Sequence, residues 1–106
     1  MPSFGINTNQ NIRDSGEIRG KAYNIACKVW FPTNSKPYPL SFKFEGDDGI
    51  LVTVTDLNIK HTDEKVYYGS KSIEYRCEAV IGGFKKDFKI IYDIERSKWI
   101  MVIQKM

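Results

Sequence analysis

Two adjacent glycines, Gly82 and Gly83, constrain the fold more than any other part of the chain. They separate two runs of alternating apolar and polar residues, over positions 73–81 and 84–92. Alternation with a period of two is typical of a half-buried strand. Glycine also accepts the positive φ angles that a tight two-residue hairpin loop requires. The sequence therefore predicts one long β-hairpin over residues 73–92, with its turn at Gly82-Gly83.

The register of this hairpin follows from its apolar residues. With a two-residue loop, four apolar pairs face each other: Ile81 and Phe84, Cys77 and Phe88, Tyr75 and Ile90, and Ile73 and Tyr92. Only Ala79, opposite Lys86, breaks the pattern. A slip by one residue would turn the apolar set towards water, so we expect this register, with the four pairs forming one wall of the core.

The opposite face of the hairpin carries the charges, and we expect it to be a solvated lattice. Like charges lie directly opposite each other there, Arg76 facing Lys89 and Glu78 facing Asp87. Such pairs are mildly unfavourable, whereas diagonal neighbours are within reach of long side chains. We therefore expect Arg76 to approach Asp87 and Glu78 to approach Lys89, with Glu74 also facing water.

The rest of the chain is also strand-like, with alternating or apolar runs over residues 23–31, 40–45, 50–59, 66–68 and 99–103. Three prolines between 32 and 39 predict a loop. A phase change within 50–59 predicts a β-bulge near Thr55-Asp56, and residues 61–64 read as a polar link. No segment has the apolar stripe of an amphipathic helix. We expect an all-β fold, a small antiparallel meander forming a barrel or half-barrel of about six or seven strands with little or no helix.

Length and composition favour a single cytoplasmic domain. A chain of 106 residues can bury one core without metal or disulfide support. Residues 1–20 show no sustained period and predict an N-terminal arm, which leaves 21–106 as one β-barrel-like domain. No apolar run reaches the roughly 18 to 20 residues of a membrane span, and the start lacks signal-peptide features. The net charge of +3 is too small to indicate a polyanion partner by itself.

Catalysis and cofactor binding find little support in the sequence. The only histidine, His61, lies in a polar segment without a nearby cysteine, and the acidic residues Asp47, Asp48 and Asp56 match no calcium loop. No phosphate-binding glycine loop is present. Cys27 and Cys77 fall at apolar positions of predicted strands, which favours buried free thiols, with a disulfide as the alternative. We expect no enzyme activity, no metal and no cofactor.

Several single residues resemble a known pattern. They are Pro39-Leu-Ser-Phe-Lys-Phe44, Gly69 before Ile73-Glu-Tyr-Arg-Cys77, then Gly83, Tyr92 and Trp99. Over roughly residues 25 to 103 the chain resembles a family of small uncharacterised bacterial proteins, commonest in Firmicutes. The resemblance implies a small all-β domain and transfers no catalytic or binding residue. The chain departs from that family in its longer N-terminal arm and in its apolar ending, where the family often has acidic residues.

Two kinds of binding remain. Three apolar residues on outward positions, Trp30, Val80 and Ile91, predict a patch for a protein partner, for a homodimer or for the arm. We therefore expect a non-catalytic protein-interaction or accessory module. The alternative is a single-stranded nucleic-acid-binding barrel, in which bases stack on aromatic rings beside lysines. Its candidate contacts are Trp30, Tyr38, Tyr67, Lys28, Lys65, Lys71, Lys85 and Lys89.

Overall fold

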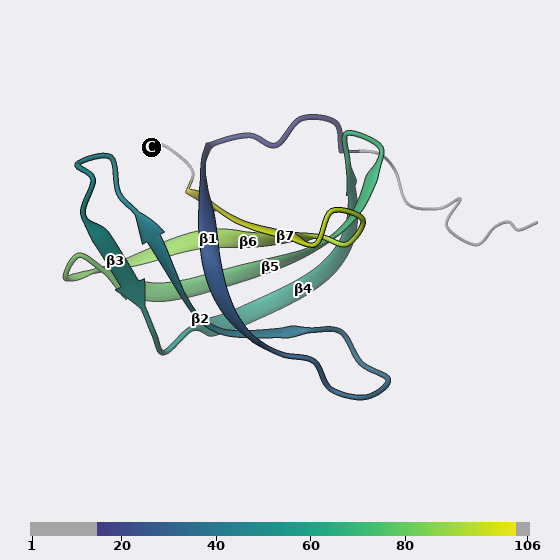
Figure 1. Ribbon diagram of the computed structural model, residues 1–106, viewed down its shortest axis with the longest axis horizontal. Coiled ribbons are helices and arrows are strands. Elements are labelled where there is room, and N and C mark those ends of the chain that lie inside the picture. The colour runs from purple at the N-terminus through teal and green to yellow at the C-terminus, as the bar shows by residue number, and fades with distance from the viewer. Residues whose placement is uncertain (1–14, 104–106) are drawn as a thin grey trace, which may run out of the picture.

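The computed structural model describes residues 15–103, which form one antiparallel sheet of seven strands (Figure 1). The strands are β1 (Lys21–Trp30), β2 (Tyr38–Glu45), β3 (Leu51–Val54), β4 (Asn58–Tyr67), β5 (Ser70–Ile81), β6 (Phe84–Asp93) and β7 (Lys98–Ile103). The described residues contain no helix. The prediction of an all-β antiparallel fold is confirmed.

The sheet is open and strongly curled. Its order is β3-β2-β1-β7-β6-β5-β4, so two meanders join where β1 pairs with β7, and β3 and β4 are the edges. Those two edges are consecutive in the chain. The four peptide steps from Val54 to Asn58 span at most about 14 Å, which forces one edge to curl back towards the other. Contacts between β3 and β5 show this curling, and the sheet is therefore a half-barrel.

The hairpin of β5 and β6 has the predicted register throughout. Ile81 pairs with Phe84, Cys77 with Phe88, Tyr75 with Ile90 and Ile73 with Tyr92. Gly82 and Gly83 both have positive φ, 62° and 85°, as a type I′ turn requires. The turn between β4 and β5 repeats this geometry at Tyr68 and Gly69, with φ of 53° and 76°.

The charged face of the hairpin differs from the prediction in two ways. Glu74 does not face water, since only 1% of it is exposed. The ion pairs across the two strands also join other residues than predicted: Lys89 Nζ lies 3.6 Å from Glu74 Oε1, and Lys85 Nζ lies 3.8 Å from Glu78 Oε1. Strand twist brings one set of diagonals together and separates the other. Both observed pairs lie along the same diagonal direction as Arg76 and Asp87, whereas the predicted approach of Glu78 to Lys89 lies along the opposite one and is wrong.

The segment between β3 and β4 also corrects the sequence analysis. The predicted bulge near Thr55-Asp56 is wrong, because the phase change marks a sharp turn between two strands on opposite edges. Asp56 has a φ of 54°, a left-handed conformation that aspartate tolerates better than most residues. The predicted polar link at 61–64 is part of β4, which pairs with β5 on one side. An edge strand with one side towards water accommodates such polar residues.

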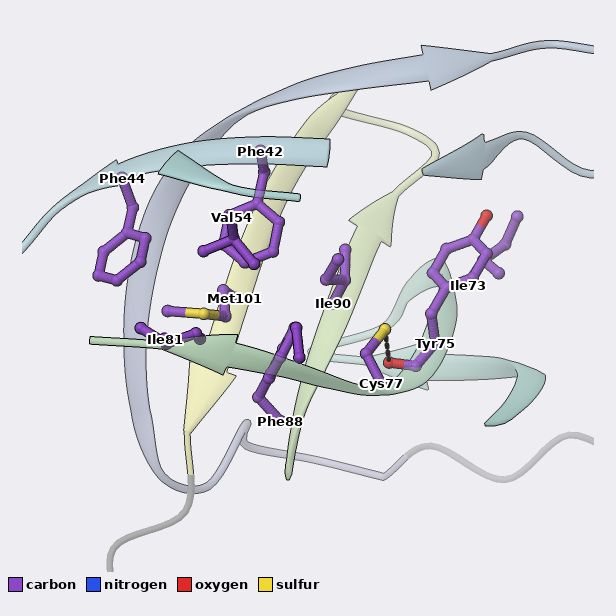
Figure 2. Packing of buried hydrophobic residues seen from close by; sticks show 11 residues of the cluster. Phe42, Phe44, Val54, Ile73, Tyr75, Cys77, Ile81, Phe88, Ile90 and Met101 are labelled. Carbon is purple, nitrogen blue, oxygen red and sulfur yellow. Dashed lines mark hydrogen bonds between the residues drawn. The ribbon is translucent and has the colours of Figure 1, made fainter. Parts of the chain in front are cut away.

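The main core lies on the inner, concave side of the half-barrel. Phe42, Val54, Tyr75, Ile90 and Met101 are each at most 1% exposed, and Figure 2 shows side chains from β2, β3, β5, β6 and β7 converging there. Two predicted core members are exceptions. Phe84 is 72% exposed because it lies beside the hairpin turn, and Tyr92 is only partly buried.

The segment 15–20 covers part of the outer face. Ser15 N donates to Val66 O, and Tyr68 N donates to Gly16 O. Ile18 then packs against a second small cluster formed by Tyr67, Ile91, Ile100 and Val102. β7 is thereby covered on both sides, as its sequence predicted. Residues 1–14 of the predicted arm lie outside the described residues.

Both cysteines are free thiols on the core side of the sheet. Burial raises the pKa of the Cys27 thiol and of the Cys77 thiol to about 12. At neutral pH only about one thiol in 10⁵ is then ionised, and the thiolate is the reactive form. We expect iodoacetamide to modify the native protein at least about 100-fold more slowly than the chain unfolded in urea. Mass spectrometry over time measures this, and equal rates in both states would contradict burial of the thiols.

Candidate interaction sites

The predicted patch of Trp30, Val80 and Ile91 does not exist as one exposed surface. Ile91 lies on the outer face as predicted, but it is buried beneath Ile18 and only 2% exposed. Trp30 and Val80 are exposed, yet they lie far apart. The start of β1 pairs with the end of β7, near the tip of the β5–β6 hairpin that carries Val80, whereas Trp30 ends β1. The structure therefore separates the two.

Trp30 instead belongs to an apolar surface at the end of the β1–β2 hairpin, which we call the aromatic patch. Its exposed members are Trp30, Phe31, Tyr38 and Leu40. Trp30 and Tyr38 are direct cross-strand partners. Since opposite side chains in a sheet lie on one face, both rings are presented on the same face of the hairpin. Four large apolar side chains within eleven residues are thus left uncovered by the described chain.

Local sequence explains why the aromatic patch faces outwards. The register of β1 and β2 shifts between Lys28 and Val29, so Val29 pairs with Pro39. This irregularity buries Pro39 and turns Leu40 out, although strict alternation from Phe42 would turn Leu40 inwards. Tyr75 OH also donates to the carbonyl of Pro37, which fixes the loop to β5. The patch is therefore displayed on an anchored hairpin.

A second surface is a groove of about 700 Å³ along β6, which we call the basic groove. Its charged lining residues are Lys60, Arg76, Lys85, Lys86, Asp87 and Lys89. Its remaining lining residues are Cys77, Phe88 and Ile103. Lys60 is held by Glu78 at 3.2 Å and Asp87 at 3.5 Å. Arg76 and Lys86 have no ion pair within the described part of the chain, so the groove keeps a positive excess.

The residues predicted for nucleic-acid contact are scattered. Tyr67 is buried, with its hydroxyl bonded to Glu74, so it offers no face for stacking. Trp30 and Tyr38 belong to the aromatic patch, with Lys28 nearby on β1. Lys85 and Lys89 line the basic groove, and Lys71 is in the turn region at the opposite end of β5. Lys65 and Lys89 line a smaller cavity of about 250 Å³ beside residues 15–19. The structure does not bring these residues into one surface.

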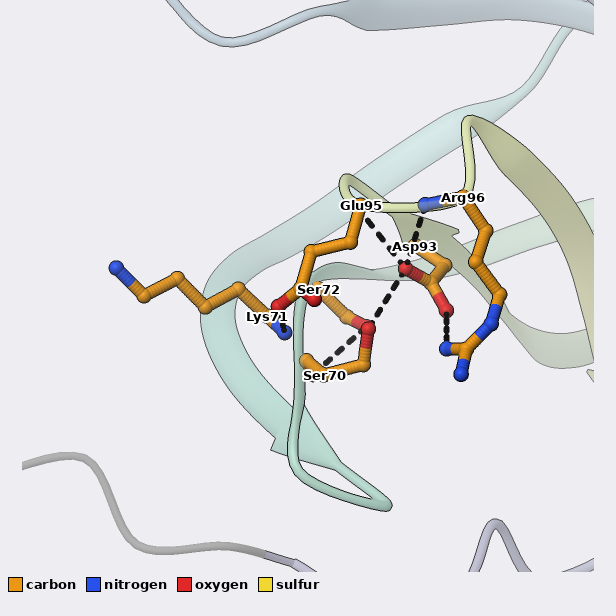
Figure 3. Close-up of polar contacts among 6 residues, drawn as sticks. All are labelled: Ser70, Lys71, Ser72, Asp93, Glu95 and Arg96. Carbon is orange, nitrogen blue, oxygen red and sulfur yellow. Dashed lines mark hydrogen bonds and ion pairs between the residues drawn. The ribbon is translucent and has the colours of Figure 1, made fainter.

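A dense polar cluster around Asp93 holds the β6–β7 turn (Figure 3). Asp93 Oδ1 accepts hydrogen bonds from Glu95 N, Arg96 N and Ser70 Oγ, while Oδ2 lies 2.8 Å from an Arg96 guanidinium nitrogen. Burial alone would raise the pKa of the Asp93 carboxyl, but the hydrogen bonds from Arg96 and Ser70 outweigh it and lower the pKa below 3.8. The cluster joins two adjacent turns and is a structural one.

Asp93 should make stability depend on pH in acid. Because its pKa is lower in the folded state, its contribution is fully present above about pH 4 and is lost as the pH falls through the folded-state pKa. We expect Asp93→Asn to lower the free energy of unfolding by about 1–2 kcal/mol at neutral pH. Urea titrations at several pH values should show this difference shrinking towards about pH 2. A difference of constant size over that range would contradict the role of the carboxylate.

The groups considered for catalysis serve local structure. Asp48 Oδ1 accepts a hydrogen bond from Ile50 N, and Asp47 Oδ1 lies 2.7 Å from Lys21 Nζ. His61 Nε2 lies 3.0 Å from Asp63 Oδ2 on the exposed edge strand β4. Between residues 15 and 103 no three histidine, cysteine or acidic side chains are grouped to hold a metal ion.

Sequence reasoning missed several residues of both surfaces. The apolar phase of Ile25, Cys27 and Val29 continues to Phe31, but Pro32 directly after it signals the end of the strand. Lys60, Arg76 and Lys86 form no motif in the sequence, and the predicted hairpin places only Arg76 and Lys86 on paired strands. They come together only through the pairing of β4, β5 and β6. No local signal in the sequence could have shown that.

Comparison of the chain with protein-family models, with curated proteins and with solved structures finds no match. The resemblance to small bacterial proteins therefore stays a prediction. Within residues 15–103, no helix could cross a membrane.

Proposed function

We propose that this half-barrel is a cytoplasmic, non-catalytic protein-interaction module that binds its partner through the aromatic patch. The observation that carries the proposal is the exposure of Trp30, Phe31, Tyr38 and Leu40 together on one anchored hairpin. Contiguous exposed apolar surface marks interaction sites in soluble proteins. Tryptophan and tyrosine are also the residue types most enriched at the energetic centres of interfaces.

The patch is well suited to a partner that packs over it. Large aromatic side chains contribute much buried area for little lost side-chain entropy. The anchoring bond from Tyr75 to Pro37 reduces the ordering that binding would require. The partner is either another protein or a second copy of the chain, which would use the same patch in a two-fold dimer.

Site-specific photocrosslinking in cells tests this proposal. A photoreactive phenylalanine analogue replaces Phe31 in one variant and Tyr68 in the other, because both are aromatic and equally exposed, at 63% and 64%. Tyr68 lies in the turn between β4 and β5, away from the patch. We expect position 31 alone to give a defined protein adduct, which is a cross-linked dimer if the partner is a second copy. No adduct, or the same adducts at both positions, would contradict the proposal.

The alternative is binding of single-stranded nucleic acid at the same rings. Its support is the Trp30–Tyr38 pair, which lies on the same outer face of β1 as Lys28. Base stacking on such rings beside a cation is a known mode of sequence-tolerant binding. Fluorescence anisotropy of a labelled oligonucleotide, measured at rising salt, tests it. Absence of binding at low salt would exclude this alternative.

A further inference from the structure

The tip of the β5–β6 hairpin extends past its neighbouring strands (Figure 1). On the β7 side, the pairing of β6 ends at Lys89 with Val102, and on the β4 side, the pairing of β5 ends at Glu78 with Asn58. Residues 84–88 of β6 therefore have no strand partner on the β7 side among the described residues. An unpaired edge presents backbone N–H and C=O groups to any extended chain that lies along it.

The basic groove runs along this same edge. Its lining includes five consecutive residues of β6, Lys85 to Lys89, whose side chains alternate between the two faces of the sheet. A groove lined by both phases of one strand follows the edge of that strand, since side chains of a single face would contribute only alternate residues. Ile103, the last described residue of β7, also lines the groove.

The charge of the groove selects among occupants. Five basic residues and one acidic residue line it, and Glu74 and Glu78 compensate only part of that charge. A second copy would bring the same basic edge, and edge lysines oppose such pairing of like copies. Single-stranded nucleic acid would match the charge, but among the residues that line the groove the only aromatic one is Phe88, which is buried.

We propose that the basic groove binds an extended acidic peptide segment of a partner protein, which adds as an extra strand to the edge of β6 that no described residue pairs with. The backbone of the segment pairs with residues 84–88, and its acidic side chains contact the two cations without an internal ion pair, Arg76 and Lys86. This site is separate from the aromatic patch. A negative result for peptide binding at the basic groove therefore does not contradict the proposal for the aromatic patch, and the reverse also holds.

The test uses the full chain and a fluorescein-labelled peptide of about ten residues in which pairs of consecutive glutamates alternate with pairs of valine or threonine, so that both faces of the added strand carry carboxylates. We expect measurable binding that weakens as salt rises. The double variant Arg76→Gln and Lys86→Gln should weaken it about three- to tenfold. The matched control Lys71→Gln and Lys98→Gln removes the same charge at the other end of β5 and the start of β7, and should change affinity by less than about twofold. Trp30→Ser should leave this affinity unchanged.

Amide hydrogen exchange distinguishes strand addition from attraction by charge alone. In an edge strand, alternate N–H groups point away from the existing partner. We expect the peptide to slow exchange at alternate amides between Phe84 and Phe88. The proposal is overturned if the peptide fails to bind at low salt, or if it binds without protecting these amides. It is also overturned if those amides are already protected in the free protein, or if an oligonucleotide binds the groove more tightly than the peptide.

Discussion

Replacement of Phe42 by alanine should lower the free energy of unfolding by about 3–5 kcal/mol. Phe42 is 1% exposed and connects the two halves of the curled sheet. From β2 its ring meets Phe88 of β6 edge-on, at 5.7 Å between centroids, and meets Phe44 at 6.0 Å. Removing it forfeits the transfer free energy of the ring and leaves a cavity that two stiff strands cannot close.

The matched control for Phe42→Ala is Leu40→Ala, two residues earlier on β2. Leu40 belongs to the aromatic patch and is 41% exposed, so its loss should cost no more than about 0.5 kcal/mol. Urea unfolding followed by tryptophan emission in a Trp30→Phe background measures both, because the remaining Trp99 stacks on Tyr92 at 4.3 Å between ring centroids and reports the packed state. Equal costs for the two variants would mean that Phe42 does not hold the halves of the sheet together. A Phe42→Ala variant with the same free energy of unfolding as the wild type would lead to the same conclusion about Phe42.

The part of the fold that could be predicted is the part set by neighbours in sequence. Gly82-Gly83 dictates a two-residue loop, and the length of that loop fixes which residues of β5 and β6 lie opposite each other. No tertiary information is needed for that step. The alternation of β1 and the two-sided burial of β7 are equally local, because each strand shows its environment in its own pattern.

The failures come from non-local contacts. Ile91 and Glu74 lie on the outer face as their phase requires, but segment 15–20 and Tyr67 cover that face, and nothing near residues 74 or 91 encodes this. Likewise, a phase change at Thr55-Asp56 is compatible with a bulge or with a turn. Only the position of β3 and β4 at opposite edges decides for the turn. Predictions of exposed surfaces fail for the same reason, because whether a residue is exposed depends on segments that are distant in sequence.

Tyr67→Phe should destabilise the protein by about 1–3 kcal/mol, although it removes a single oxygen. The Tyr67 hydroxyl donates to Glu74 Oε1, and burial together with this bond raises the pKa of Tyr67. Glu74 is buried, and besides the Tyr67 hydroxyl its Oε1 has Lys89 Nζ at 3.6 Å. Without the hydroxyl, a buried charged acceptor loses its hydrogen-bond donor, which costs more than a neutral bond contributes. Tyr68→Phe is the control, because Tyr68 is adjacent and exposed.

The double variant Tyr67→Phe and Glu74→Leu should recover most of that loss and come within about 1 kcal/mol of the wild type. Tyr67→Phe removes the hydrogen-bond donor of Glu74 Oε1, beside Oε2, which is buried without a hydrogen-bond partner in the wild type. Glu74→Leu leaves the Tyr67 hydroxyl without its acceptor, whereas the double variant removes all three oxygen atoms. The surroundings are already apolar, since Ile18, Ile91 and Val102 pack on this side of the sheet. Lys89 is partly exposed and regains water when Glu74 is removed. Urea titrations of all four proteins give the coupling energy, which should exceed about 1 kcal/mol. Additive losses would show that the two side chains contribute independently, and that the buried carboxylate is satisfied by other groups.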